Sequence, residues 1–393
     1  MTTGVVDDEV DTALSRVRPL LGLVAQHADG ANAERRPAQP VIDAFGDAGL
    51  MRLVAPAAYG GHEAHPEVLL AVVEAVAAVD GSTGWTVMTC NEEMGIACAF
   101  LPAATMSALV RERPDVVIAG SGLTSGRARR APGEDGWLVS GRWRFVTGCP
   151  AADMIVLGNL VDEAGGGPPS RSCYVLVPRS EVAIEDTWKV AGMRGTGSHD
   201  VVLDDRFVAD RWAGVSDAAR GVTVPDTAFF RLPYGLRFPF PKVGVAAGIA
   251  RAAIASFVEL AGAKTPVAAR SRLCDRASAQ AALAEATALV EAGRALVSVE
   301  LARLWATAGA GEPISAEQHA RCRLACSYSV SSSVSATELV CREAGSTANF
   351  DSAPFARQLA DVRAVAQHFM VAPYQMATAG RVLIGLDSDD PSF

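Results

Sequence analysis

The chain has 393 residues, of which half are apolar and 20% are charged. This composition excludes a disordered or low-complexity protein, and the length is enough for two or three domains or one large multilayer fold with a sizeable core. Acidic residues outnumber basic ones 44 to 35, which gives a formal net charge of −9, so neither nucleic acid nor an anionic membrane surface is expected as a partner.

The N-terminal residues and the cysteines predict a cytoplasmic protein. The segment MTTGVVDDEVD is acidic and lacks the basic and apolar regions of a signal peptide. No stretch reaches the roughly 18 uninterrupted apolar residues of a membrane-spanning helix. The eight cysteines are scattered without a CxxC pair, which indicates buried thiols in a reducing compartment rather than a disulfide framework.

Three regions of different character follow one another along the chain. Residues 1–114 carry apolar residues at helical spacing, as in LLAVVEAVAAV, and are expected to form an N-terminal helical domain. Residues 115–215 hold short β-branched runs such as MIVLGNLV and CYVLVP, separated by Gly, Pro and Asp. Because no helical pattern lies between these runs, we expect a central β domain built as an antiparallel sheet or small barrel.

Residues 216–393 return to long Ala-rich helices, the last of them from about residue 356 to 386. They are expected to form a C-terminal helical bundle, so the fold class is α+β. Long helices with such broad apolar faces often pack between subunits, and we therefore expect a homo-oligomer.

Several common catalytic motifs are absent from the sequence. No GxGxxG follows a predicted strand, and GxxxxGK[ST], GxSxG and HExxH do not occur. A Rossmann nicotinamide site, P-loop phosphate chemistry, the common hydrolase nucleophile and the commonest zinc site therefore lack support. Of the six histidines only His62 and His65 lie close together, and with no Cys or further His nearby we expect no metal site.

Three segments carry a specific resemblance: GWLVSGRWRFVTGCPAADMIVLGNLV (136–161), EDTWKVAGMRGTGSHDVVLDDRFV (185–208) and AGSTANFDSAPFARQLADVRAVAQHFMVAP (344–373). They resemble the acyl-CoA dehydrogenase fold. Within it they are most similar to the oxygenase components of group D two-component flavin-dependent monooxygenases, such as hydroxyphenylacetate hydroxylase. The resemblance covers nearly the whole chain in the same order, and it implies an acyl-CoA dehydrogenase-like fold and a homotetramer.

The resemblance places two strand segments, 121–125 and 141–148, along a flavin ring. The cofactor-binding residues that it implies here are Ser121, Leu123, Thr124, Trp143, Phe145 and Thr147. Strand alternation along RWRFVTG would place Trp143, Phe145 and Thr147 on one face, as an apolar wall with a hydroxyl. Thr147 is also implied in catalysis, through a hydrogen bond to flavin N5. For Trp143 and Phe145, ordinary strand packing is the alternative.

At the flavin phosphate the resemblance implies residues that cross a subunit boundary. Arg272 and Gln280, with Arg276 beside them, lie where the family extends an Arg and a Gln to a neighbouring subunit. One departure concerns Asp361, because Ala360 precedes it where related oxygenases often have Arg. Arg357 or Arg363 are the alternatives for that role.

His368 is the candidate catalytic base. Acyl-CoA dehydrogenases abstract a proton with a Glu at one of two positions, but this chain has no Asp or Glu within 227–258 or 362–386. In the second window the resemblance places a histidine, here His368, against the substrate. A neutral imidazole bonded to a phenol hydroxyl would favour the phenolate and make the ring a better nucleophile. The alternative is a packed or surface histidine on an amphipathic helix.

The segment DTAFFRLPYGLRFPFP is dense in aromatic residues, in a chain with only 6% aromatic residues overall. This enrichment suits a flat apolar substrate. The expected substrate-binding residues are Phe230, Tyr234, Phe238 and His368, with Phe229 and Phe240 nearby. The alternative is a structural wedge between the β domain and the bundle.

These features predict an oxygenase that receives reduced FMN or FAD from a separate NAD(P)H:flavin reductase, because the chain lacks a dinucleotide fingerprint. By resemblance, O₂ forms a C4a-hydroperoxide on the flavin and one oxygen passes to an aromatic or phenolic substrate, with no metal. Three alternatives remain open: N- or S-oxygenation by the same intermediate, an acyl thioester dehydrogenase, and a noncatalytic flavin- or acyl-binding scaffold.

Overall fold

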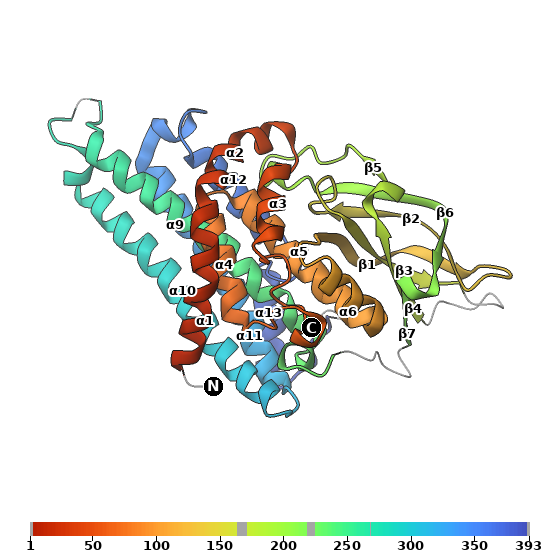
Figure 1. Cartoon of the computed structure of the whole chain (residues 1–393). Coiled ribbons are helices and arrows are strands. Elements are labelled where there is room, and N and C mark those ends of the chain that lie inside the picture. The colour runs from red at the N-terminus through yellow and green to blue at the C-terminus, as the bar shows by residue number, and fades with distance from the viewer. Residues whose placement is uncertain (1–2, 163–170, 218–224, 268, 391–393) are drawn as a thin grey trace.

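The computed structural model describes residues 3–162, 171–217, 225–267 and 269–390. Helices make up the first part of the chain: α1 (Thr3–Val17), α2 (Leu21–Glu34), α3 (Gln39–Asp47), α4 (Pro66–Ala77), α5 (Gly81–Phe100) and α6 (Ala103–Glu112). The chain then enters a sheet that lies to one side of the helices (Figure 1). The N-terminal helices and the acyl-CoA dehydrogenase-like order of elements agree with the sequence prediction.

The sheet has seven strands in the order β5-β6-β2-β1-β3-β4-β7. Their bounds are β1 (Ile118–Arg130), β2 (Gly136–Val146), β3 (Met154–Val161), β4 (Arg171–Pro178), β5 (Ala183–Glu185), β6 (His199–Ala209) and β7 (Ala213–Asp217). All neighbours pair antiparallel except β1 and β3, which run parallel with Ile118 opposite Met154. The prediction of a purely antiparallel sheet is therefore wrong, because the succession of strand patterns does not encode which strands become neighbours.

The remaining helices form a bundle beside the N-terminal ones. They are α7 (Ala228–Arg231), α8 (Tyr234–Arg237), α9 (Pro239–Ala263), α10 (Ala277–Gly309), α11 (Ala316–Ala344), α12 (Phe355–Ala366) and α13 (Tyr374–Leu383). The prediction of one last helix from about 356 to 386 is wrong, because the helix is broken between Ala366 and Tyr374. Pro373 ends this break, and a proline disfavours helical backbone in the residue before it. His368 lies in the break rather than on a helix.

Helix α9 occupies the centre of the bundle. The segment Tyr234–Ala263 is long and apolar enough to cross a membrane by length and composition alone, with a mean hydropathy of 1.6. In this fold it packs against α4, α5, α11 and α12, and 56% of its most apolar stretch is buried. The core helix of a globular protein has the same properties, so its apolar composition is explained by packing.

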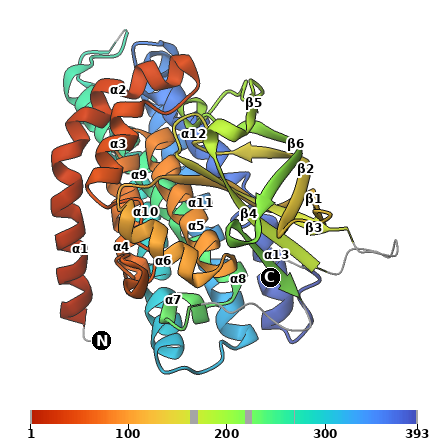
Figure 2. The same cartoon turned by 45° about the vertical axis from the view of Figure 1, so that its right-hand side comes forward.

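Helix α5 connects the sheet to the bundle. It contacts β1 on one side and α9 and α12 on the other, and it runs between the two parts of the molecule (Figure 2). Asp80 caps its N-terminus by accepting the backbone N–H of Thr83 at 2.8 Å, which satisfies one of the otherwise unpaired amides of the first turn. Side chains of α5 therefore lie between the sheet and the bundle and can contact residues of both.

A buried carboxyl also connects the two parts. Asp361 of α12 is 4% exposed and accepts the backbone N–H of Met193, 2.5 Å away, from the segment that precedes β6. Burial is the main reason that the pKa of Asp361 is raised to about 7, and the nearby Asp80 raises it further. The protonated acid is therefore the form that the fold favours.

We predict that Asp361→Asn makes unfolding less dependent on pH. The unfolded carboxyl ionises from about pH 4, whereas the folded one does so only near pH 7, so stability of the wild type falls as pH rises between these values. Between pH 5 and 8 the variant should gain on the order of 2 kcal/mol relative to the wild type. Urea unfolding at both pH values measures this gain, with the exposed Asp351→Asn as control. If the free energy of unfolding changes by the same amount between pH 5 and pH 8 in Asp361→Asn and in the wild type, the raised pKa of Asp361 is contradicted.

Candidate active site

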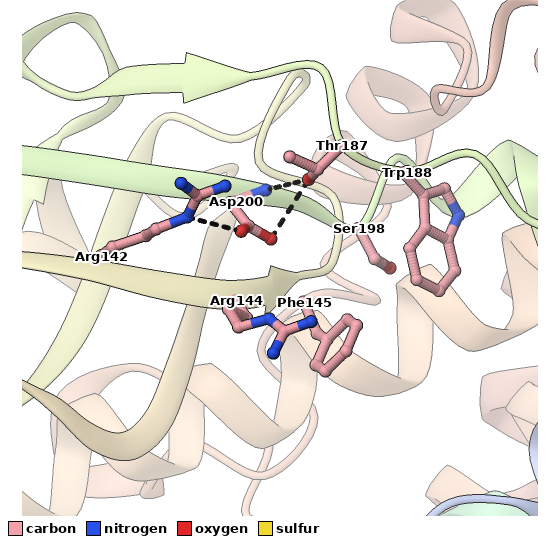
Figure 3. Close-up of a pocket in the computed structure, with 7 residues that line it drawn as sticks. All are labelled: Arg142, Arg144, Phe145, Thr187, Trp188, Ser198 and Asp200. Carbon is pink, nitrogen blue, oxygen red and sulfur yellow. Dashed lines mark hydrogen bonds and ion pairs between the residues drawn. The ribbon is translucent and has the colours of Figure 1, made fainter.

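A groove of about 350 Å³ opens on the sheet near its β5–β6 edge. Its described lining consists of Arg142, Arg144, Phe145, Thr187, Trp188, Ser198 and Asp200. Figure 3 shows these side chains converging from β2, from the segment after β5 and from β6. The groove offers two aromatic rings and two guanidinium groups, a combination that suits a flat ring system with an anionic substituent.

The arginines of the groove differ in their contacts. Arg142 donates from Nε to Asp200 at 2.8 Å and pairs with Glu185 at 2.7 Å, so its charge is already compensated. The guanidinium of Arg144 lies 5.1 Å from the centre of the Phe145 ring and is exposed to solvent. Arg144 is therefore the better placed of the two to meet a phosphate of a bound ligand.

Phe145 reaches the groove because the strand is bulged. Trp143 pairs with Val201 but Val146 pairs with His199, so β2 has one residue more than β6 in this interval. Phe145 adopts a φ of 61°, an uncommon and costly value for an aromatic residue that usually persists where function requires it. As a result its ring is 57% exposed and meets Trp188 edge-to-face with 6.1 Å between the centroids.

The same bulge separates Trp143 from Phe145. The Trp143 side chain is fully buried, and its Nε1 donates to the carbonyl of Gly158 at 2.7 Å. It packs so closely on Gly126 that a β-carbon there would lie 2.1 Å from the indole. The expected common face for Trp143, Phe145 and Thr147 is therefore wrong, since simple strand alternation does not pass through a bulge.

Thr147 is buried behind Ser198, which lines the groove, in a chain of buried hydroxyl groups. Its Oγ1 is 2.8 Å from Oγ of Ser198, which is 2.8 Å from Oγ1 of Thr196. Thr196 donates to the carbonyl of Met193 at 2.9 Å, so it must accept from Ser198, and Ser198 in turn must accept from Thr147. The proton of Thr147 is thus committed to Ser198, and its oxygen acts as an acceptor.

Trp85 of α5 joins Thr147 to His368. The indole Nε1 of Trp85 donates to Oγ1 of Thr147 at 3.3 Å, and its ring lies edge-on to the imidazole of His368 with 5.7 Å between centroids. The structure therefore brings together the two residues predicted to be catalytic, although they are separated by more than 200 positions in the sequence. Trp85 was not predicted, and a single tryptophan in a helix gives no sequence signal for such a role.

His368 is neutral and has a defined tautomer. Burial, with the charges of Lys242 and Arg323, holds the pKa of His368 well below its usual value. Its Nδ1 accepts the backbone N–H of Met370 at 3.3 Å, so the ring proton resides on Nε2. In this arrangement Nε2–H is a donor to a substrate oxygen. The role of His368 as a base stays a prediction, and the bond from Met370 to Nδ1 favours hydrogen-bond donation from Nε2.

A buried charged cluster lies beside Trp85 and escaped the sequence analysis. Lys242 of α9 is almost fully buried, pairs with Glu92 of α5 at 2.8 Å, and places its ammonium 5.7 Å from the Trp85 ring. Glu93, the next residue, is buried too. The available signal was the presence of charged residues within otherwise apolar helices, at NEEMGIACAF and FPFPKVGVAAGIA, since such residues are rarely buried without a partner or a function.

The aromatic segment divides into two groups. Phe230 is buried against Phe229 and beneath the guanidinium of Arg237, so in this structure it is a packed side chain, and its role toward a substrate stays a prediction. Tyr234 is 39% exposed, yet burial raises its pKa well above the usual value. Its ring packs edge-on against Phe238, at 4.7 Å.

Other predicted residues lie outside the groove in this chain. Ser121 is buried in β1, Thr124 is half-buried and Leu123 is exposed, and the described lining of the groove includes none of the three. Arg272 lies in the connection between α9 and α10 and Gln280 in the first turn of α10, an end of the bundle remote from the sheet (Figure 1). Their role stays a prediction that requires a second subunit.

The structure also shows the contacts of Arg357 and Arg363, the alternatives to an arginine before Asp361, and the described groups that could bind a metal. Arg357 pairs with Asp29 at 2.7 Å and Arg363 with Glu338 at 2.8 Å, so both are engaged away from the groove. Among the residues that the structure describes, no group of three His, Cys, Asp or Glu side chains could hold a metal ion.

Comparison with known proteins identifies the family. Residues 17–104 match the N-terminal domain of acyl-CoA dehydrogenases and residues 242–373 their C-terminal domain. An indole-3-acetate monooxygenase of Acinetobacter baumannii is 30% identical over 353 residues, covering 88% of this chain and 87% of the relative. The oxygenase subunit HsaA of Rhodococcus jostii, a flavin-dependent monooxygenase, is 28% identical and covers 90% and 93%.

The fold comparison agrees with the sequence matches. The crystal structure of 3-HSA hydroxylase from Rhodococcus sp. RHA1 superposes with a TM-score of 0.85 at 26% identity, covering 97% of this chain and 98% of the other. The family expected from the three sequence segments is confirmed. The chain belongs to the acyl-CoA dehydrogenase family, and within it to the flavin-dependent monooxygenases.

Proposed function

We propose that this chain is the oxygenase component of a two-component monooxygenase, cytoplasmic and homotetrameric, that hydroxylates a phenolic or related aromatic substrate. The observation that carries the proposal is the position of Trp85, which contacts Thr147, the buried neighbour of Ser198 in the groove, and His368 in the break between α12 and α13. A cofactor ring in the groove and a substrate beside His368 would then be neighbours. That proximity is what an oxygen transfer between them requires.

The names of the relatives support the type of chemistry. They include indole-3-acetate monooxygenases and an FADH₂-dependent resorcinol hydroxylase, oxygenase component, from Rhizobium, 28% identical over 389 residues. An oxygenase component implies a separate reductase, and all of these named substrates are aromatic. The exposed Arg272 and Gln280 would reach a flavin only in a neighbouring copy, which supports an oligomer.

The residues of the groove fit a reduced flavin. Phe145 and Trp188 offer an aromatic wall, Arg144 a free cation for phosphate, and Thr147 an acceptor for the N5–H that a reduced flavin carries and an oxidised one lacks. When bound, the reduced flavin supplies the activation of O₂ and the transfer of one oxygen atom. The protein holds the ring, keeps water away from it and presents the substrate.

His368 would hold the substrate oxygen. Its Nε2–H, fixed by the backbone bond to Nδ1, can donate to the hydroxyl oxygen of a phenol. Such a donor stabilises negative charge on that oxygen, so the ring becomes more nucleophilic where oxygen is transferred.

We predict that Thr147→Val weakens binding of reduced flavin about fivefold and changes binding of oxidised flavin much less. The hydrogen-bond chain orients Thr147 as an acceptor, and loss of one such bond is worth about 1 kcal/mol. Anaerobic fluorescence titration with both redox forms of FMN and of FAD measures the preference. Thr147→Ser, which keeps the hydroxyl, is the matched control. Equal losses for the two redox forms would contradict the assigned direction.

We predict that His368→Ala lowers substrate hydroxylation on the order of 100-fold while binding of reduced flavin remains within a few-fold of wild type. Oxygen consumption should continue with release of hydrogen peroxide, because the cofactor site is untouched. Product analysis and peroxide determination in parallel check this outcome. His27→Ala, a half-buried histidine of α2 that does not line the groove, serves as control. Unchanged coupling in His368→Ala would place the substrate elsewhere.

The proposed function is tested by reconstitution with a flavin reductase, NADH, FMN or FAD, ¹⁸O₂ and a panel of phenols and hydroxyindoles. One ¹⁸O atom in the product, dependent on reduced flavin, is the expected result. Oxidation of an acyl-CoA with bleaching of bound flavin, and no incorporation of ¹⁸O, would instead support the dehydrogenase alternative.

A further inference from the structure

The aromatic wall of the groove and the hydroxyl chain behind it meet at one residue, Met193. The indole Nε1 of Trp188 donates to the carbonyl of Met193 at 2.9 Å, and Oγ1 of Thr196 donates to the same carbonyl at 2.9 Å. From Thr196 the hydroxyl chain runs through Ser198 to Thr147. The wall and the chain therefore depend on the position of the same carbonyl oxygen.

Met193 is held in an unfavourable conformation by a carboxyl from the bundle. Its φ is 57°, a value that costs energy for a residue with a side chain and persists where the surrounding structure imposes it. Its backbone N–H donates to Oδ1 of Asp361 at 2.5 Å, across 168 positions of the sequence. Asp361 on α12 thus supports the residue on which the groove wall depends.

The backbone of the same segment also touches the backbone of α12. A β-carbon on Gly192 would lie 2.2 Å from the carbonyl oxygen of Ala360, far closer than two such atoms can approach. Gly192 and Ala360 directly precede Met193 and Asp361. A change at either position of α12 therefore acts on Met193 without an intervening side chain.

The other bonds of Trp188 hold its main chain and leave its ring to Met193. Nη1 of Arg35 donates to the carbonyl of Trp188 at 3.1 Å, and the N–H of Trp188 donates to Nδ1 of His199 at 3.3 Å. These two bonds fix where the residue lies. The bond from Nε1 to Met193 fixes which way the indole turns toward the groove.

The charged groups near Asp361 are engaged elsewhere. Arg357 on α12 pairs with Asp29 of α2 at 2.7 Å, and Asp80 caps α5 by accepting the N–H of Thr83. A buried carboxyl costs stability, and a leucine of similar volume would avoid that cost. Leucine would leave the N–H of Met193 without its acceptor, so the carboxyl is explained by the position of Met193 rather than by packing.

We propose that Asp361 is a positioning residue of the groove, which holds the Trp188 indole and the hydroxyl chain in place for a cofactor ring by accepting the N–H of Met193. The part of the inference that concerns the cofactor rests on the proposed function. The part that concerns the orientation of Trp188 does not, so the two can be tested separately.

The orientation of Trp188 is tested without any cofactor by ¹⁹F NMR of protein labelled with 5-fluorotryptophan. The chain has six tryptophans, and Trp188→Phe assigns the resonance. Asp361→Leu should shift or broaden the Trp188 resonance and leave that of Trp305, in α10, unchanged. Asp361→Asn keeps an acceptor oxygen and should give the wild-type spectrum, a rescue that a loss of packing would not show.

The effect on the cofactor is measured by anaerobic titration with reduced FMN and FAD. Asp361→Leu should bind the preferred flavin about fivefold more weakly, the equivalent of one lost hydrogen bond, whereas Asp361→Asn should bind it as the wild type does. Glu300→Leu, which removes a second buried carboxyl in α10, is the matched control and should leave both the affinity and the Trp188 resonance unchanged.

A second variant covers the case in which Asp361→Leu does not fold. Gly192→Ala keeps the carboxyl but forces the segment away from Ala360, so it should alter the Trp188 resonance and weaken flavin binding in the same direction. Gly380→Ala is its matched control, because a β-carbon on that residue of α13 meets no described atom within 4 Å.

An unchanged Trp188 resonance in Asp361→Leu and Gly192→Ala would overturn the proposal, as would equal losses of flavin affinity in Asp361→Leu and Asp361→Asn. If the wild type binds neither flavin while the Trp188 resonance responds as described, the proposed function fails and the anchoring of Trp188 by Asp361 stands. The two failures are therefore distinguishable in the same set of proteins.

Discussion

The arrangement of the site depends on the indole of Trp85, which stands where the sheet, helix α5 and the last helical segments meet. Its N–H is donated to Thr147 on the sheet side, its ring faces His368 on the bundle side, and the ammonium of Lys242 lies over it. Because α5 packs against both parts of the molecule, this one side chain links the residues behind the groove to His368. In the proposed function, a cofactor and a substrate bound on its two sides would be neighbours.

Local departures from regular structure supply the functional groups. A one-residue bulge with a positive φ turns Phe145 outward while Trp143 stays in the core, and the break before Pro373 presents His368 at the end of α12. A chain of hydroxyls ending on the carbonyl of Met193 orients Thr147 as an acceptor. In each case regular secondary structure would have placed these groups in the core or in solvent. The free energy that the strained backbone costs is therefore spent at the residues of the candidate site.

The sequence predicted the family, the order of helices and strands, and two residues, Thr147 and His368, that the fold brings together through Trp85. It did not predict the parallel pairing of β1 with β3, because periodicity reports which face of a strand is buried and not which strand lies beside it. The strand alternation that placed Trp143 beside Phe145 failed at the bulge. In the sequence, Glu92, Glu93 and Lys242 appear only as charged residues within apolar segments. The structure adds that α5 packs against α9, which brings Lys242 into an ion pair with Glu92.

In the proposed function, cofactor and substrate occupy opposite sides of Trp85. A crystal structure of the chain with reduced flavin and 5-hydroxyindole, prepared without oxygen, tests this most directly. The flavin ring should lie against Phe145 with N5 near the hydroxyl of Thr147, and the hydroxyindole should lie with its oxygen at His368. A flavin bound away from the groove, or a substrate on the same side of Trp85 as the flavin, would contradict it.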